Sequence, residues 1–405
     1  MVDPADNVKR FDIVDMLRGF ALSGILFINI TAFYAPGGPP GFGFDGSTFD
    51  RLVIYALILF VESKFFTLFS FLFGVGFSIQ FLRTQQSGKE FVRRFARRLL
   101  ALALFGIAHI VLLWEGDILL LYALVGFILL LFRNASTRTL LKWVLALLIV
   151  PLMLVAVSLA ITQAARTISA TSAQVRQGDA EILIQVTRSR AEAVRNLSGG
   201  TYGSILKQRI ASYGETFFLL LSRVPLVLAM FLLGMWAGKK GILQHVGDHL
   251  PLLRRVRFWG LILGLLTSLL TIVGYAWLPP ISALITLFFN QTLAGPLLSL
   301  GYAATLVLLA QRPFWRRTFK PLATFGRMSL TNYLVQSLVC AVTFSGYGFG
   351  LAGKVAPIVG VFIASIIFSA QILFSKLWLQ CYRFGPMEWF WRSITYLKLQ
   401  LMRQP

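Results

Sequence analysis

Residues 105–122, FGIAHIVLLWEGDILLLY, join two apolar runs through a short polar turn. His109 stands inside the first run, and Trp114, Glu115 and Asp117 stand in the turn that follows it. Apolar segments separated by so few residues are expected to form an antiparallel helical hairpin, which gathers these four side chains at one end. Ionisable side chains at membrane depth cost about 3 kcal/mol each on insertion scales, so this cluster is the first candidate for a functional site.

The composition indicates a membrane protein. Of the 405 residues, 57% are hydrophobic and 13% are charged, whereas soluble domains are about 25% charged. Apolar runs of about 18 or more residues recur along the chain, which is typical of transmembrane helices and not of the alternating strands of a membrane barrel. We therefore expect an all-α, polytopic membrane protein.

The positive charge does not indicate a nucleic-acid partner. Lys and Arg number 38 against 16 Asp and Glu, which gives a net charge of +22. These cations lie mainly between the apolar runs, where positive-inside topology and contact with anionic membrane lipids explain them. A nucleotide-binding phosphate loop is not indicated either, because Gly74 and Gly76 of LFGVGF lack that motif and are expected to permit close helix packing.

Cysteine and histidine spacing predicts no metal site. Cys340 lies within an apolar run and Cys381 near a basic end, and neither belongs to a disulfide framework or a ligand motif. His245 and His249 have a spacing that can bind metal on a helix, but no third ligand of clear type accompanies them. We expect no metal and no bound cofactor.

The apolar windows predict ten transmembrane helices. The first is expected to be a permanent transmembrane helix and not a cleaved signal peptide, because Asp15 and Arg18 stand at its start and no small-residue cleavage site follows. The eighth is long enough to be tilted, or to be broken near Gly295 and Pro296. The predicted spans are 17–35, 52–82, 98–114, 117–132, 140–162, 215–238, 258–278, 280–310, 322–345 and 355–379.

Charge in the connecting loops predicts the orientation. Strongly basic loops alternate with loops that hold almost no Lys or Arg, so the positive-inside rule places the basic loops and both termini in the cytoplasm. The basic loops are 83–98, 133–142, 239–257 and 312–320, and the others are 36–51, 115–116, 279 and 346–354.

One long polar segment departs from this alternation and divides the chain. Residues 163–214 carry several arginines, yet the alternation places them on the non-cytoplasmic side of the membrane. The positive-inside rule permits this for long loops. This extracytoplasmic segment is expected to be amphipathic and partly helical. It separates an N-terminal half of five spans, 1–162, from a C-terminal half of five spans, 215–405.

With this orientation, polar side chains of the first four spans converge in the outer half of the membrane. A histidine near a carboxylate can be held in one tautomer and act as a base near neutral pH. The alternative is that His109 is an interfacial histidine, hydrogen-bonded to a neighbouring helix. The converging residues are Asn29, Glu62, Lys64, His109, Glu115 and Asp117.

Other members of this cluster have structural alternatives. Asp117 could cap the helix that begins near Ile118, and it could serve both purposes. Glu62 and Lys64 could form an ion pair that only satisfies itself, or Lys64 could extend to the outer headgroups. Trp114 is a candidate substrate platform, but a place in the interfacial aromatic belt is the stronger expectation.

A second group of polar residues falls at the cytoplasmic side. Asp15 and Arg18 are three residues apart at the start of the first span, so they share a helix face. In residues 325–336, FGRMSLTNYLVQ, Arg327 is expected at the cytoplasmic face and Asn332 inside it. A buried amide commonly ties helices together, and Arg327 could be a positive-inside anchor. Together with Arg18, Arg327 could instead meet an anionic ligand from the cytoplasm.

Five motifs follow in the order seen in YeiB-like bacterial inner-membrane proteins, a family the chain resembles over nearly its full length. They are FDIVDMLRGFALSGILFIN, SKFFTLFSFLFGVGF, HIVLLWEGDILLLYALVG, FGRMSLTNYLVQS and RFGPMEWFWR. The resemblance implies a multi-pass protein of the bacterial cytoplasmic (inner) membrane. That family is similar to a wider transmembrane acyltransferase superfamily, which includes the lysosomal heparan-glucosaminide acetyltransferase and the acyltransferase-3 enzymes.

The resemblance implies an enzyme that moves an acyl group from cytoplasmic acyl-CoA to an acceptor at the far side of the membrane. Enzymes of that superfamily use an intramembrane histidine, which by position would be His109, with Asp117 in its neighbourhood. Asp15, Arg18 and Gly19 match the family's first-span signature. The resemblance to the lysosomal enzyme also implies a homodimer.

Acyl transfer with acyl-CoA as co-substrate is therefore the leading hypothesis. His109 would act as the base or carry the acyl group, and Asp117 or Glu115 would orient its imidazole. A transporter or lipid translocator could use the same polar cluster, and a non-catalytic scaffold would leave the cluster without a purpose. The CoA phosphates are expected near Arg18, Arg327 and either Arg97 or Arg98. Asp15 and Asn332 are expected on the same cytoplasmic side. Asn29 or Lys64 could stabilise the oxyanion that forms during acyl transfer.

Overall fold

The described part of the chain is built from α-helices. The computed structural model describes residues 4–40, 46–83 and 88–403, and within them one isolated β-bridge, Tyr382 with Arg403, is the sole extended pairing. The all-α class predicted from the sequence is confirmed. Parts of two predicted loops, 41–45 and 84–87, lie outside the described residues.

The helices follow one another with short connections. Their bounds are α1 Pro4–Tyr34, α2 Thr48–Phe60, α3 Lys64–Arg83, α4 Gly88–Leu112, α5 Leu119–Leu131, α6 Thr137–Thr167, α7 Ser169–Gly199, α8 Tyr202–Leu221, α9 Val224–Lys239, η1 Val246–His249, α10 Leu250–Trp277, α11 Pro280–Phe289, η2 Asn290–Ala294, α12 Gly295–Leu309, α13 Pro313–Thr318, α14 Lys320–Arg327, α15 Ser329–Phe344, α16 Pro357–Cys381 and α17 Pro386–Tyr396.

The fold is that of a polytopic membrane protein. Seven helical segments of the described chain are long and apolar enough to cross a membrane. Three shorter apolar helices, α5, α9 and α15, occupy the remaining positions at which the sequence predicts spans. The number of crossings, ten, stays a prediction.

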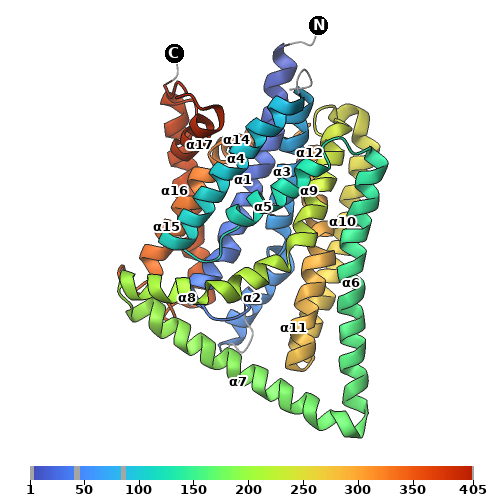
Figure 1. Cartoon of the computed structure of the whole chain (residues 1–405), viewed down its shortest axis with the longest axis vertical. Helices are drawn as coiled ribbons and strands as arrows, with labels where there is room; N and C mark the ends of the chain where they lie inside the picture. The colour runs from blue at the N-terminus through green and yellow to red at the C-terminus, as the bar shows by residue number, and fades with distance from the viewer. Residues whose placement is uncertain (1–3, 41–45, 84–87, 404–405) are drawn as a thin grey trace.

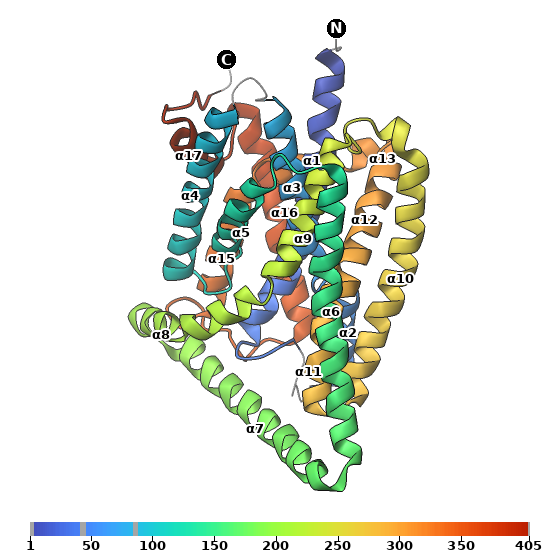
Figure 2. The same cartoon turned by 45° about the vertical axis from the view of Figure 1, so that its right-hand side comes forward.

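Most helices run along the long axis of the molecule (Figure 1). The start of α1 and the last helix, α17, lie at one end, here called the terminal end, and α7 crosses the opposite end, here called the α7 end. Figure 2 shows α13 and the connection between α9 and α10 at the terminal end as well. These basic connections therefore share an end with the termini, as the alternation of loop charge predicts, while their cytoplasmic location stays a prediction.

Two interrupted helices face each other within the bundle. The span predicted at 52–82 is divided, because α2 ends at Phe60 and Ser63 adopts a left-handed φ of 67° before α3 begins. The long eighth span is interrupted at Asn290–Ala294, where five residues form a π-helix directly before Gly295. A break near Gly295 is predicted from the sequence, whereas the break before α3 is not.

The buried Lys64 amine explains the first break. Lys64 is fully buried, and its Nζ donates hydrogen bonds to the Ile58 carbonyl oxygen at 2.7 Å and to Asn290 Oδ1 at 3.1 Å. A continuous helix would keep the Ile58 carbonyl in its own hydrogen-bond ladder, so the break supplies the acceptor that a buried ammonium requires. The close approach at Gly295 fits this arrangement, since a Cβ there would lie 2.9 Å from the Ser63 carbonyl oxygen.

The segment 163–214 is more regular than the sequence predicts. Two long helices, α7 and α8, occupy it, and α8 continues to Leu221, so residues 215–221 precede the break before α9. On α7, Asp179 accepts hydrogen bonds from Arg166 at 2.6 Å and from the Ile281 amide at 2.9 Å. Burial by itself raises the pKa of Asp179, but the hydrogen bonds from Arg166 and Ile281 and the charge of Arg166 outweigh it and lower the pKa below its ordinary value. The pair ties α7 to α6 and α11.

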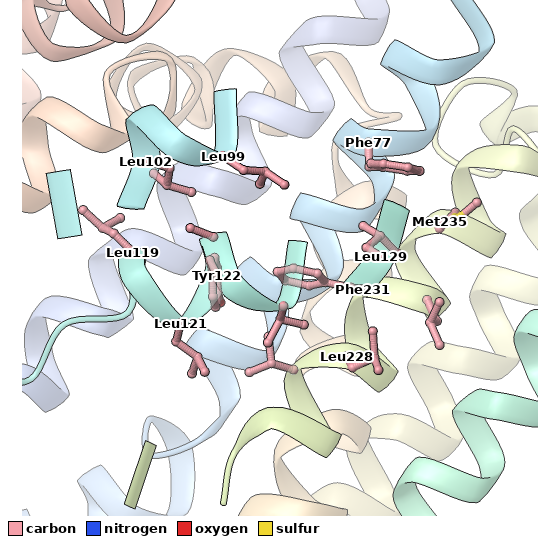
Figure 3. Packing of buried hydrophobic residues seen from close by; sticks show 14 of the residues in the cluster. Phe77, Leu99, Leu102, Leu119, Leu121, Tyr122, Leu129, Leu228, Phe231 and Met235 are labelled. Carbon is pink, nitrogen blue, oxygen red and sulfur yellow. The ribbon is translucent and has the colours of Figure 1, made fainter. Parts of the chain in front are cut away.

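The main apolar core draws on both predicted halves. Figure 3 shows Tyr122 of α5 packed among side chains of α3, α4 and α9, including Phe231. The Tyr122 hydroxyl donates to the Phe66 carbonyl oxygen at 2.8 Å and lies 2.6 Å from Ser70 Oγ. Helix α1 packs against α14, α15 and α16, and α3 packs against α9. Residues of 1–162 and 215–405 therefore share one core.

The crossing of α3 and α9 depends on two glycines. A Cβ on Gly74 would collide with the Phe231 carbonyl oxygen, and a Cβ on Gly234 would collide with the Phe71 carbonyl oxygen. The close packing predicted for Gly74 is thus confirmed. Gly76 instead lies beside the Arg18 guanidinium, 3.2 Å from where its Cβ would stand.

Gly74→Ala is expected to lower the free energy of unfolding by about 1–3 kcal/mol, because the added methyl overpacks a backbone contact. Thermal unfolding in detergent, followed by tryptophan fluorescence, measures the effect. Gly203→Ala is the matched control, since no atom lies within 4 Å of its added Cβ and alanine favours a helix. Equal stability of the two variants would contradict the proposed role of the crossing.

Candidate functional site

Three side chains from distant parts of the chain meet inside the bundle. His109 Nδ1 lies 3.0 Å from Asp117 Oδ1, and both side chains are fully buried. On the other side of the ring, His109 Nε2 lies 2.8 Å from Ser337 Oγ, 228 residues later in the chain. The Nδ1 to Oδ1 distance is within hydrogen-bond range, but the angles depart from those of an ideal hydrogen bond.

The turn between α4 and α5 places Asp117 against His109. Asp117 Oδ2 accepts a hydrogen bond from the Leu120 amide at 2.7 Å, three residues ahead, which is the geometry of a helix cap. Gly106 of α4 leaves room for this carboxylate, because a Cβ there would lie 2.8 Å from Asp117 Oδ2. Asp117 therefore caps α5 with one oxygen and faces the imidazole with the other.

Helix α15, which carries Ser337, is fixed at several points. The Glu388 carboxylate of α17 accepts hydrogen bonds from the Leu330 amide at 2.6 Å and the Thr331 amide at 3.1 Å. These backbone amides of the first turn of α15 have no acceptor within the helix itself. Asn332 Nδ2 donates to the Phe325 carbonyl oxygen at 3.1 Å and to Ser375 Oγ at 3.0 Å. These contacts hold Ser337 in register with His109.

A tyrosine completes the surroundings of the imidazole. The Tyr333 ring on α15 lies 5.0 Å from the His109 ring, measured between centroids. Its hydroxyl is buried and has no hydrogen bond of good geometry within the described chain. Trp114 lies farther from His109, with centroids 6.4 Å apart, and packs on Phe33 at 5.0 Å.

A cavity of about 480 Å³ is lined on one side by α17, the helix at the terminal end, and on another by direct neighbours of this group. It lies between α1, α3, α4, α5, α14, α15 and α17, and we call it the arginine cavity. Tyr333 and Ile118 line it, so the cavity reaches the direct neighbours of His109 and Asp117. Five arginines line it as well, namely Arg18, Arg98, Arg327, Arg383 and Arg392.

A second cavity of about 640 Å³ adjoins the arginine cavity. The two cavities share Arg18, Arg98 and Arg392, and the second adds Arg94. Apolar side chains of α3 and α4 complete its walls. Together the two cavities present a strongly cationic surface next to an apolar interior, which suits a ligand with an anionic head and an apolar tail.

Few carboxylates offset this charge. Asp15 Oδ1 lies 3.0 Å from Arg18 Nη1, which confirms that the two share a helix face. Glu388 also lines the arginine cavity, but its oxygens accept hydrogen bonds from the start of α15 and from the Thr331 hydroxyl. The Arg98 guanidinium stacks 3.9 Å from the Trp391 ring centroid, which orients it without neutralising it.

A small pocket of about 80 Å³ lies on the opposite side, toward α7 and α8, and Trp114 and Glu115 line it. Glu115 Oε2 lies 3.4 Å from Arg209 Nε of α8, and Arg209 Nη1 donates to the Val111 carbonyl oxygen at 3.1 Å. The predicted choice between Asp117 and Glu115 as partner of the imidazole is thereby resolved in favour of Asp117. Glu115 is engaged with α8.

The other residues predicted to gather near His109 lie in different surroundings. Lys64 bonds to Ile58 and Asn290, and Glu62 acts on it through charge at longer range. Asn29 is half-buried on α1, and neither it nor Glu62 contributes one of the hydrogen bonds described for the pair. The proposed oxyanion role of Asn29 or Lys64 therefore lacks geometric support.

The residues predicted at the cytoplasmic side separate into two groups. Asp15, Arg18 and Arg327 line the arginine cavity. Asn332 is not among its lining residues and instead ties α15 to α14 and α16, as expected of a buried amide. No group of three or more potential metal ligands occurs among the residues that the structure describes.

Sequence reasoning did not identify Ser337, Tyr333 or Arg392 as members of the site. Serine and tyrosine are ordinary residues of membrane helices, and Arg392 belongs to a basic C-terminal segment. The available signal is the spacing of Tyr333 and Ser337, which places both on one face of α15. That face becomes informative only once α15 is known to lie against His109.

Asp117→Ala is expected to lower the free energy of unfolding by about 2–3 kcal/mol, because it removes a helix cap and leaves the buried imidazole without its partner. Thermal unfolding in detergent measures the loss. Glu192→Ala serves as the control, since its ion pair with Arg188 joins side chains that are 44% and 80% exposed and contributes under about 1 kcal/mol. A loss no larger than that of the control would show that the buried pair is not stabilising.

Comparisons with known proteins agree on a family. Residues 237–398 match the family described as "Protein of unknown function (DUF418)". "Uncharacterized protein YxaH" of Bacillus subtilis is 36% identical, over 98% of this chain and 97% of its own length. "Uncharacterized protein YeiB" of Escherichia coli is 30% identical, over 96% of this chain and 97% of its own length. No solved structure matches. From these full-length matches, the chain belongs to the YeiB-like family of proteins with a DUF418 domain.

Proposed function

We propose that this protein is a membrane-embedded acyltransferase of the bacterial inner membrane. It would take an acyl group from cytoplasmic acyl-CoA and pass it to an acceptor in or beyond the outer half of the membrane. The observation that carries this proposal is the position of the buried His109–Asp117 pair, next to the deep wall of a cavity lined by five arginines. The terminal end would then face the cytoplasm, in keeping with its basic connections.

The cavities suit the parts of an acyl-CoA. Its phosphates need several cations that can form paired hydrogen bonds, and Arg18, Arg98 and Arg392 lie at the junction of the two cavities. The pantetheine arm and acyl chain need an apolar passage, which Leu22, Phe69 and other side chains of the arginine cavity supply. The thioester would then approach Tyr333, beside the imidazole.

The histidine supports the chemistry of acyl transfer. The Asp117 carboxylate at Nδ1 favours the tautomer with its proton on that nitrogen, which makes Nε2, in contact with the Ser337 hydroxyl, the proton acceptor. A base of this kind removes the proton of an attacking hydroxyl or amine. The small pocket beside Trp114 lies on the other side of the pair, so the acceptor would approach from the α7 end.

Acyl-CoA binding and release of free CoA by purified protein in nanodiscs test the proposal. His109→Ala is expected to bind acyl-CoA and to release CoA at least about 100-fold more slowly, because the base is removed. Arg18→Gln is expected to weaken binding by about 10-fold or more, because a charge-assisted contact is lost. His249→Ala is the control, as its ring bonds to the Lys240 carbonyl oxygen and lines neither cavity. If acyl-CoA of no chain length binds, the proposal fails.

A transporter or lipid translocator is the second candidate, and the break before α3, which faces the π-helical turn at Asn290–Ala294, favours it. Interrupted helices that expose backbone and polar groups within the membrane are typical of transporter binding sites. Here the break before Lys64 faces the π-helix at Asn290, and Glu62 Oε2, Ser63 Oγ and Asn290 Nδ2 are buried without hydrogen-bond partners within the described chain.

Lys64→Met distinguishes the two candidates. If the protein is a transporter, substrate flux into proteoliposomes is expected to fall at least about 10-fold, because a buried charge that holds both broken helices is removed. CoA release by the same variant would remain within about threefold of the wild type if acyl transfer is the function, since Lys64 is bonded to Ile58 and Asn290. Flux that is absent in the wild type rules out the transporter.

A further inference from the structure

We propose that Ser337 is the nucleophile of a Ser–His–Asp triad and that the protein carries the acyl group on Ser337 Oγ during turnover. The donor in this step, acyl-CoA, rests on the proposed function, whereas the activated serine rests on geometry alone. Ser337 Oγ lies 2.8 Å from His109 Nε2, and Asp117 Oδ1 lies 3.0 Å from Nδ1.

The order of the three groups is that of serine acyl-transfer enzymes. A carboxylate at Nδ1 sets the tautomer, Nε2 accepts the proton, and the hydroxyl at Nε2 becomes the attacking oxygen. A different part of the structure positions each of the three side chains. Helix α4 carries the imidazole, the hydrogen bond that caps α5 fixes the carboxylate, and contacts of Glu388 and Asn332 hold the helix that carries the serine. Triads of this kind are recognised by geometry and not by sequence position.

A serine at this place could also do no more than satisfy a buried nitrogen. Two observations favour the nucleophile. Nε2 is already occupied by the Ser337 hydroxyl, so direct deprotonation of an acceptor would first require that hydroxyl to leave, whereas Ser337 already lies where the base can take its proton. Ser337 also lies four residues after Tyr333 on the same helix face, and Tyr333 lines the arginine cavity. A thioester that reaches the deep wall is thus one helical turn from the hydroxyl.

Tyr333 offers a donor for the oxyanion. Its hydroxyl is buried and lacks a hydrogen bond of good geometry within the described chain, and its ring lies 5.0 Å from that of His109. A preorganised donor at such a place stabilises the negative charge that develops on a carbonyl oxygen during acyl transfer. The Ile118 backbone lies beside this hydroxyl, but no hydrogen bond that the hydroxyl donates is found within the described chain, so its proton is available for the oxyanion.

The covalent steps balance. The Ser337 hydroxyl attacks the thioester carbonyl carbon while His109 Nε2 takes its proton, and collapse of the tetrahedral intermediate breaks the carbon–sulfur bond. CoA leaves as the thiol with that proton, and the acyl group remains as an ester on Ser337. An acceptor hydroxyl or amine then attacks the ester carbonyl as His109 takes its proton. The Ser337 oxygen leaves and regains that proton, which releases the acylated acceptor.

Two probes test the triad on the full chain in nanodiscs. Acyl-CoA of two chain lengths, acetyl and palmitoyl, is followed by acid quench and mass spectrometry of the protein, together with CoA release. A fluorophosphonate labels an activated serine irreversibly, so that signal does not depend on how fast an acyl ester turns over. We expect the fluorophosphonate on Ser337, no label on Ser337→Ala or His109→Ala, and CoA release reduced at least about 100-fold in Ser337→Ala. Ser337→Cys should convert the adduct into a thioester that neutral hydroxylamine cleaves.

Ser299→Ala is the matched control, because Ser299 is a fully buried serine of α12 whose hydroxyl donates to the Pro296 carbonyl oxygen and which lines neither cavity. It should keep both the label and CoA release. If Ser337→Ala releases CoA at the wild-type rate while His109→Ala does not, the triad is overturned and acyl transfer stands. If the wild type releases no CoA, the acyl-CoA function fails, and the fluorophosphonate decides the triad by labelling Ser337 or leaving it unlabelled.

Discussion

Asp117 places a carboxylate where water does not reach it, and the surrounding helices are arranged to compensate its charge. One oxygen accepts a hydrogen bond from the Leu120 amide in the first turn of α5, and the other faces the His109 ring. Nε2 of the same ring also needs a polar partner, and Ser337 supplies it, which brings α15 against the ring. Glu388 of α17 in turn caps the start of α15. The burial of one acid thus sets the positions of three helices and the C-terminal segment.

The fold class and the approximate places of the apolar helices could be predicted from the sequence, because each depends on local hydropathy. Gly74 could be assigned to a close crossing for a similar reason, since small residues permit helix backbones to approach. The break before Lys64 could not be predicted, because it depends on the burial of the Lys64 amine against Asn290, 226 residues away in the chain. Helices α7 and α8 were underestimated, since a polar helix carries no apolar signature.

The members of the candidate site could likewise be predicted only where they lie close together in the sequence or where loop charge places them. His109 and Asp117 lie in one hairpin, so their meeting follows from the turn between them, and Arg18 and Arg327 could be placed at one end by loop charge. Ser337 and Tyr333 could not be added, because nothing local distinguishes them from other polar residues of membrane helices. Glu115, Asn29 and Lys64 were predicted at the same depth as His109, but depth does not determine which helix a side chain faces.

The separation of His109 and Ser337 has a consequence for biosynthesis. The hairpin with His109 and Asp117 leaves the ribosome first, and Ser337 follows 228 residues later. At about 5–20 residues per second, roughly 10 to 45 seconds pass before the second element of the contact exists. Until then, the Ser337 hydroxyl that His109 Nε2 contacts in the finished bundle has not been synthesised. Membrane insertion and completion of the site are therefore distinct events in the life of this protein.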